Sequence, residues 1–228
     1  MSTKKVLVWD VPVRLVHWLL VASFAGAFLT ADSERLRVLH VLFGTTLAGL
    51  VVFRLVWGIV GTRYARFAGF AFGPRAVLRY LRSVATLKSV RYIGHTPAGS
   101  WAIWLMLGLG LAAAGTGYGA YAGRAEWLED THGALAWVLL AVVVVHVTGV
   151  ALGSVLHREN LVLAMLTGRK RGEAGDGIPR SRWLVGAAVA ALVLVFWLDL
   201  VSIPGLPMRA GGAKGVDGGH AAVHREAD

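Results

Sequence analysis

The stretch THGALAWVLLAVVVVHVTGVALGSVLHR, from Thr131 to Arg158, decides what kind of protein this is. It carries no Asp, Glu, Lys or Arg before its last residue, and about 20 apolar residues are enough to cross a bilayer as one helix. The stretch nevertheless contains His132 and His146. Ionisable side chains at membrane depth are costly and mark functional sites. We therefore expect a transmembrane helix built around two histidines.

The two histidines are fourteen positions apart in the chain. At about 100° per residue they lie on nearly the same face of the helix, and at about 1.5 Å per residue they are about 21 Å apart along its axis. One helix therefore presents an imidazole at two depths of the membrane.

The composition of the whole chain indicates a membrane protein. Its 228 residues are 56% hydrophobic and only 16% charged, whereas soluble domains carry about 25% charged residues. The absence of cysteine excludes disulfides, Cys-ligated iron–sulfur clusters and covalent haem attachment through CxxCH. The net charge of +10 is concentrated in loops between apolar segments. We therefore assign it to membrane topology and anionic lipid, and expect no nucleic-acid partner.

Further apolar segments precede and follow the first one. Together they predict an all-α integral membrane protein, with a four-helix transmembrane bundle and an additional fifth transmembrane helix. We expect the bundle domain over residues 6–171 and a disordered extracytoplasmic tail over residues 209–228. The expected bounds of the other helices are 11–31, 35–60, 98–122 and 183–201.

Several helix starts are recognisable. Asp10 is expected to cap the first helix and Thr96 the third, each with a proline in the first turn, where its missing N–H does no harm. The polar turn 32–34 is expected to cap the second helix. The glycines of the third helix are expected to permit close helix packing.

The loops differ in charge and so predict the orientation. Cations dominate residues 54–97 and 157–182, while the turns 32–37 and 124–130 are acidic or balanced. The positive-inside rule then places the N-terminus in the cytoplasm and the C-terminus outside. Within the first basic segment, the sequence RAVLRYLRSV after Pro74 separates apolar residues from arginines, which is typical of an amphipathic helix on a membrane surface.

Two more histidines fall inside the predicted spans. His17 lies near the cytoplasmic start of the first helix and His40 near the outer start of the second. Because the fourth helix runs inward, the depth of His132 matches that of His40, and the depth of His146 matches that of His17. Two imidazoles that face each other across a bundle can fill both axial positions of a non-covalent haem b. We therefore expect two such haems, stacked through the membrane as an electron-transfer route.

Other interpretations of the histidines fit less well. A single histidine in a membrane helix is often only a hydrogen-bonded packing residue, but four that form two pairs are difficult to explain in that way. A zinc site is disfavoured because HExxH is absent and the pairs differ too much in depth to share one metal. No nucleotide-binding loop or nucleophile–base arrangement is visible, so we expect an electron-transfer protein or a subunit of an oxidoreductase complex, without catalytic residues.

The residues also resemble those of a known family. The segments VWDVPVRLVHWLL, LHVLFG, FRLVWGIVGTRYARFAGF, RYIGHTPAG and HVTGVALGSVLHRENLVLAMLTGRKR are similar to the bacterial cytochrome b561 family. That family includes the b-type cytochrome subunits of nickel–iron hydrogenases and is similar to the membrane subunit of formate dehydrogenase. The resemblance covers residues 6–171. It implies a bacterial cytoplasmic membrane and haem ligands at His17, His40, His132 and His146, paired His40–His132 and His17–His146.

Four further residues are candidate cofactor contacts. Arg14 and Arg54 lie at the cytoplasmic ends of the first two helices, where they either pair with propionates of the inner haem or bind lipid phosphates. Gly44 and Gly149 each lie about one turn from a histidine. They either let a macrocycle approach the backbone or serve helix packing.

Four histidines stay outside the ligand set. His95 precedes the third helix and has either a surface or capping role or a role in a quinone site. His157 lies at the exit of the fourth helix and is expected to be interfacial. His220 and His224 belong to the tail, where two histidines are usually incidental.

Our leading hypothesis is a transmembrane di-haem b cytochrome that transfers electrons between the quinone pool and an extracytoplasmic redox partner. The alternative is a haem-containing membrane anchor that docks a dehydrogenase, a hydrogenase or a cytochrome c and has no quinone site of its own. A haem-free transporter or sensor is a third hypothesis. The expected partners are therefore membrane lipid, quinone and a soluble redox protein.

Overall fold

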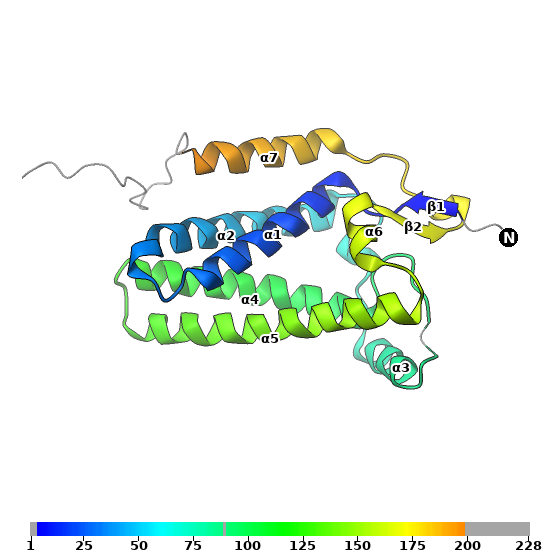
Figure 1. Ribbon diagram of the computed structural model, residues 1–228, viewed down its shortest axis with the longest axis horizontal. Coiled ribbons are helices and arrows are strands. Elements are labelled where there is room, and N and C mark those ends of the chain that lie inside the picture. Colours follow the sequence, from blue (N-terminus) through cyan, green and yellow to red (C-terminus); the bar gives the residue numbers. More distant parts are fainter. Residues whose placement is uncertain (1–3, 89, 199–228) are drawn as a thin grey trace, which may run out of the picture.

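The computed structural model describes residues 4–88 and 90–198. Four long helices run along the longest dimension of the molecule (Figure 1). Each is long and apolar enough to cross a membrane. The predicted bundle of four membrane helices is therefore confirmed, and α5 begins about one turn earlier than expected. The four helices are α1 (Val11–Leu29), α2 (Arg37–Val60), α4 (Pro97–Tyr121) and α5 (Trp127–Leu156).

Two of the predicted helix caps are present. The Asp10 carboxylate accepts a hydrogen bond from the Val13 N–H at 2.8 Å, and the Thr96 hydroxyl accepts one from the Gly99 N–H at 3.1 Å. Each cap is followed by a proline in the first turn. These short polar side chains therefore fix where α1 and α4 begin.

The predicted cap of the second helix at residues 32–34 is wrong. A single 3-10 turn, η1 (Glu34–Leu36), precedes α2 directly. The residue before α2 is consequently Leu36, which has no side-chain oxygen to accept a hydrogen bond. Glu34 instead forms an exposed ion pair with Arg37 at 3.3 Å, and such pairs stabilise a helix only weakly.

The helices pack in the order α1 on α2, α2 on α4 and α4 on α5. Leu47 and Val51 of α2 form a buried cluster with Leu107 of α4. Large apolar side chains of the same helices also face outward, as expected where lipid rather than protein covers the surface. Examples are Val52, Val56, Leu105, Val138, Val144, Val145 and Val147.

A shorter apolar helix, α7 (Trp183–Trp197), runs beside α1 and α2 (Figure 1, orange). At its start a Cβ on Gly186 would lie 2.6 Å from Cγ1 of Val11, so the two helices are in close contact there. At its other end, the indole N–H of Trp197 donates to the hydroxyl of Thr46 at 3.0 Å. The helix thus packs mainly along α1 and reaches α2 at its far end.

The predicted fifth transmembrane helix, 183–201, stays a prediction. The 15 residues of α7 extend over about 22 Å at about 1.5 Å per residue, whereas the hydrocarbon core of a bilayer is about 30 Å thick. Residues 199–201 lie outside the described part of the chain, as does the tail 209–228 with His220 and His224.

Short elements gather where α1 begins and α5 ends, at the right of Figure 1, and we name this the basic end. The opposite end, where α1 turns into α2 and α4 into α5, is the turn end. At the basic end two short strands that the sequence pattern did not predict pair antiparallel. The elements there are β1 (Lys4–Leu7), η2 (Phe67–Gly69), α3 (Pro74–Ala85), α6 (Leu161–Thr167), β2 (Arg169–Gly172) and η3 (Ala174–Asp176).

Candidate functional site

His40 of α2 and His132 of α5 face each other at the turn end. Their ring centroids are 5.8 Å apart and their planes are inclined at 89°. Two imidazoles bound to opposite sides of one metal ion have centroids about 6 Å apart, because each metal–nitrogen bond is about 2 Å long. The two rings therefore lie close to the separation that a shared metal ion with two axial imidazoles requires.

A backbone carbonyl orients each of these two rings. Nδ1 of His40 donates to the carbonyl of Ala27 in α1, and Nδ1 of His132 donates to the carbonyl of Ala113 in α4, both at 2.8 Å. Because each carbonyl can only accept, Nδ1 carries the proton and Nε2 is left with its lone pair. This is how proteins prepare a histidine as a metal ligand.

The backbone of α4 also passes close to His132 at Gly117. A Cβ at this position would lie 2.9 Å from both Nδ1 and Cε1 of the imidazole, which is closer than carbon atoms pack. The sequence pattern assigned the glycines of this helix only to packing. The contact between Gly117 and His132 arises only from the packing of α4 on α5.

His17 of α1 and His146 of α5 lie nearer the basic end. They are close enough to interact electrostatically. The ring of His17 lies edge-on to that of Trp18, with the centroids 5.1 Å apart. Its Nδ1 is buried and has no hydrogen-bond partner among the described residues. This pair therefore lacks the backbone support that the turn-end pair has.

Buried nitrogens without a partner gather around His17. Within residues 4–88 and 90–198 they belong to three neighbouring residues of α1 and to one residue of α2, the helix that packs on it. A buried donor left without an acceptor costs about 1–3 kcal/mol, so a group that carries acceptors is expected between these helices. The carboxylates of a haem are suitable acceptors. The four atoms are Arg14 Nε, His17 Nδ1, Trp18 Nε1 and Arg54 Nη1.

Arg54 is the most enclosed cation of this group. Its side chain is only 7% exposed, and its guanidinium carbon lies 5.0 Å from the ring centroid of Phe67 and 5.9 Å from that of Phe70. This burial disfavours the predicted alternative in which Arg54 binds lipid phosphates. Arg14, the other predicted partner of a propionate, donates one hydrogen bond to the carbonyl of Leu166.

The buried carboxylate of Asp10 joins the two helices that carry these cations. Besides capping α1, it accepts hydrogen bonds from the indole N–H of Trp57 at 3.1 Å and from the hydroxyl of Thr62 at 2.6 Å. Asp10 is fully buried and also interacts electrostatically with Arg54. It therefore fixes α1 against the end of α2, a role beyond the predicted cap.

His95 lies in the loop before α4 and stacks on two aromatic rings. Its centroid is 4.7 Å from that of Trp9 and 4.1 Å from that of Phe70. Burial, reinforced by the positive charges of Arg54 and Lys170, lowers the pKa of His95 to about 3. The ring is therefore neutral at physiological pH. It lines a pocket together with Arg63, Tyr64, Gly69, Phe70, Phe72, Tyr92, Ile93, Gly94 and Asp176.

The remaining candidates have simpler surroundings. A Cβ added at Gly44 or Gly149 would meet no atom of the chain within 4 Å. Close packing within this chain therefore does not explain either glycine, and both leave space beside a histidine-bearing helix. His157 directly follows the last residue of α5, at the predicted exit of the helix.

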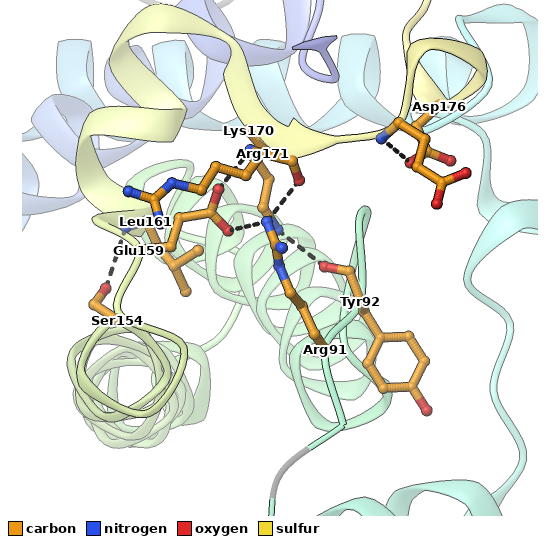
Figure 2. Close-up of polar contacts among 9 residues, drawn as sticks. Arg91, Tyr92, Ser154, Glu159, Leu161, Lys170, Arg171 and Asp176 are labelled. Atoms are coloured by element: carbon orange, nitrogen blue, oxygen red, sulfur yellow. Dashed lines mark hydrogen bonds and ion pairs between the residues drawn. The ribbon is translucent and has the colours of Figure 1, made fainter. Parts of the chain in front are cut away.

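A polar network ties the end of α5 to β2 and to the loop that carries His95 (Figure 2). The Glu159 carboxylate accepts from the Arg91 guanidinium at 3.2 Å and from the Arg171 N–H at 2.7 Å. Arg91 also donates to the carbonyl of Arg171 at 2.6 Å, and buried Lys170 donates to the carbonyl of Tyr92 at 3.1 Å. The network holds the loop against the end of α5.

Comparison with known proteins identifies the family. Residues 8–168 match the family model described as prokaryotic cytochrome b561. The chain belongs to this family. It is therefore a multi-pass membrane protein and a b-type cytochrome, whose cofactor is haem b and whose chemistry is electron transport. The resemblance found in its sequence motifs is confirmed.

Two curated relatives of this cytochrome have the same description. A probable Ni/Fe-hydrogenase B-type cytochrome subunit of Rhizobium leguminosarum bv. viciae is 24% identical over 213 residues, which cover 73% of this chain and 89% of that protein. A probable Ni/Fe-hydrogenase B-type cytochrome subunit of Azotobacter chroococcum mcd 1 is 26% identical over 209 residues, or 72% of this chain and 87% of that protein. No solved structure matches the chain.

Proposed function

We propose that this cytochrome holds two haem b groups and transfers electrons across the cytoplasmic membrane, between the quinone pool and an extracytoplasmic redox partner. The observation that supports this most strongly is the pairing of histidines at two levels of one bundle. The ring centroids of His40 and His132 are 5.8 Å apart at the turn end. His17 and His146 lie close enough to interact electrostatically nearer the basic end.

Each pair would hold one haem b through its two imidazoles. When bound, the haem would supply a one-electron redox couple for electron transfer. The protein orients the turn-end imidazoles through the carbonyls of Ala27 and Ala113. At the basic end, Arg14 and Arg54 bind the propionates, which explains their buried nitrogens without partners. Gly44 and Gly149 leave room for the macrocycles.

The two histidine pairs lie at different depths along the bundle, and this arrangement defines the path of electron transfer. His132 and His146 are separated by about 21 Å along α5, so electrons move between two depths of the membrane rather than within one plane. We assign the basic end to the cytoplasm by the positive-inside rule. The N-terminus then lies inside, and with α7 crossing as a fifth span the C-terminus lies outside. The bundle domain is residues 6–171, and the tail 209–228 is extracytoplasmic.

The proposed partners lie at opposite ends. The names of the two relatives support a hydrogenase subunit as the soluble partner, and we assign it to the turn end. Quinone binds near the basic-end haem, where the pocket that contains neutral His95 offers aromatic walls. The alternative function is a haem-containing anchor that docks a dehydrogenase, a hydrogenase or a cytochrome c without a quinone site.

Haem content and redox titration of the purified protein test this function. We expect two bis-histidine haems in the wild type. His40→Ala and His132→Ala should each remove the same haem, while His17→Ala and His146→Ala should each remove the other. His157→Ala is the matched control and should retain both. A single haem with all four histidines intact, or losses that follow other pairs, would contradict the proposal.

Reduction by a quinol separates the two functions. A cytochrome linked to the quinone pool is reduced by a soluble quinol in the isolated protein, through the basic-end haem first. An anchor without a quinone site is reduced by dithionite but not by quinol.

A further inference from the structure

Helix α3 (Pro74–Ala85) lies at the basic end, beside the transmembrane bundle rather than within it (Figure 1). It packs on α4, and the side chain of its Val77 is buried. The ring of Tyr80 lies edge-on to that of Tyr92, with the centroids 5.9 Å apart. One face of α3 therefore packs on the protein, and the side chains of its other faces are exposed.

Beside the packed face lies an exposed apolar strip. Leu78 and Leu81 are 50% and 49% exposed. At about 100° per residue they stand about 100° and 40° from Val77 around the helix. Leu87, just after the helix, is exposed as well. Protein does not cover these leucines, although burying each would contribute about 1.5–3 kcal/mol.

The next strip around the helix is cationic. Arg75, Arg79 and Arg82 are all exposed, and the same helical geometry places them about 140–200° from Val77, directly beyond the leucines. The chain contains no Asp or Glu between Glu34 and Glu126. The two ion pairs within the described residues use other arginines. The three guanidinium groups therefore have no carboxylate within the described chain.

Two tryptophans on α4 mark the level at which α3 lies. Trp101 and Trp104 are partly exposed near the start of that helix, and tryptophan concentrates at the interface between membrane and water. The indole N–H of Trp101 donates to the carbonyl of Phe72 at 2.9 Å, just before α3 begins. This bond holds the start of α3 at the interfacial level.

We propose that α3 is a binding surface for anionic phospholipid of the leaflet at the basic end. Leu78 and Leu81 enter the boundary of the acyl chains, while Arg75, Arg79 and Arg82 bind the phosphates. An apolar strip flanked by arginines matches a lipid surface, which is apolar below and anionic above. Arginine suits this role because its planar guanidinium binds phosphate in a bidentate manner.

The depth of α3 tests the apolar half of the proposal. The chain has no native cysteine, so Leu78→Cys and Arg79→Cys each give one site for a spin label in the full-length protein. In vesicles of phosphatidylcholine and phosphatidylglycerol, we expect the label at position 78 to be accessible to oxygen and protected from a water-soluble nickel chelate. The label at position 79 should be accessible to the chelate.

Lipid preference tests the cationic half. The relative association of spin-labelled phosphatidylglycerol over phosphatidylcholine should fall at least about fivefold in the variant R75Q/R79Q/R82Q, because each cation near a lipid surface contributes about a fivefold factor. The difference should shrink in high salt. The variant R35Q/R37Q/R124Q at the turn end removes the same charge and should keep most of the preference.

Three results would overturn the proposal. The first is an unchanged lipid preference in R75Q/R79Q/R82Q. The second is a label at position 78 that the nickel chelate reaches, which would leave α3 in water. The third is a label there that neither probe reaches, because protein then covers the strip and the occupant is a partner subunit or a second copy. The labelled variants keep all proposed haem ligands, so their result holds even if the triple variant fails to fold.

Discussion

The two histidine pairs of this cytochrome differ in what supports them. At the turn end, His40 and His132 each donate to a backbone carbonyl of a helix that carries no part of that pair. At the basic end, Nδ1 of His17 has no such carbonyl among the described residues, and three further buried nitrogens near it, on Arg14, Trp18 and Arg54, also have no partner there. The backbone orients one histidine pair, whereas buried nitrogens beside the other pair have no acceptor among the described residues.

The difference has a physical consequence for each site. The turn-end rings are already oriented, so they lose little side-chain freedom when a ligand binds. The basic-end site keeps donors and cations out of water at a cost of about 1–3 kcal/mol for each unsatisfied group. Its stability therefore depends on its occupant, whereas the stability of the turn-end site depends on close backbone packing. The two sites should therefore respond differently to substitution.

The largest effect is expected for Gly117→Ala. The added Cβ would lie 2.9 Å from the His132 ring, so the ring or α4 must move and the turn-end haem should be lost, while the basic-end haem remains. Haem content and the low-spin EPR signals measure this. Gly115→Ala is the matched control, because its Cβ meets nothing within 4 Å. Two haems with unchanged EPR signals in Gly117→Ala would contradict the prediction.

Asp10→Asn should mainly affect stability at the basic end. The amide retains one acceptor oxygen but turns its NH₂ group toward donors that the carboxylate now satisfies, those of Trp57 and Thr62. Because hydrogen bonds to charged groups contribute about 1.5–3 kcal/mol each, the free energy of unfolding should fall by about 3 kcal/mol. A lower midpoint of thermal unfolding in detergent would show it. The exposed Asp32→Asn should leave that midpoint unchanged, and an equal drop in both variants would argue against a special role of Asp10.

Arg54→Gln should change the potential of the basic-end haem alone. A buried cation favours the reduced, more negative state, so its removal should lower the midpoint potential by on the order of 60 mV, equivalent to about 1.4 kcal/mol for one electron. Redox titration of both haems measures the shift, with the turn-end haem as internal reference. The exposed Arg66→Gln is the control. A shift of both haems by the same amount would mean that Arg54 acts on the whole protein.

The smallest effect concerns the pH dependence of stability. Burial lowers the pKa of His95 to about 3 from its ordinary value of 6.5. Between these values the unfolded chain binds a proton that the folded chain does not, so His95 lowers stability as the pH falls from about 6.5 to about 3. His95→Phe keeps a ring against Trp9 and Phe70 but cannot be protonated. Its unfolding midpoint should therefore fall less than that of the wild type between pH 7.5 and pH 5. Midpoints that fall by the same amount in both proteins would contradict this.

Much of the bundle could be predicted from the sequence because its signals are local. A continuous apolar run defines a membrane helix without reference to the rest of the chain, and Asp10 and Thr96 mark helix starts through bonds that span three residues. The predicted cap at 32–34 was wrong because a 3-10 turn moved the start of α2 beyond it. The ligand roles of the histidines rest on predicted depths and on the family, and they stay predictions.

The contacts that the sequence did not predict join distant parts of the chain. The strands β1 and β2 pair Lys4 with Gly172 and Leu7 with Arg169. They are too short and too strongly charged to show the alternating pattern of a buried strand. Likewise, the role of Gly117 depends on a ring that α5 brings to α4. A glycine in an apolar helix has the same appearance in the sequence whether it faces lipid, a helix or an imidazole.

The sequence alone thus determined the membrane class, the four transmembrane spans and the positions of the histidines along them. Hydropathy and spacing are local properties, so they can be evaluated without knowing how the helices pack. Only the tertiary structure decided which carbonyls orient His40 and His132, which nitrogens are buried without partners, and that Asp10 joins α1 to α2. The reason is that a hydrogen bond depends on positions within a few tenths of an ångström. Those positions are set by how whole helices pack against one another.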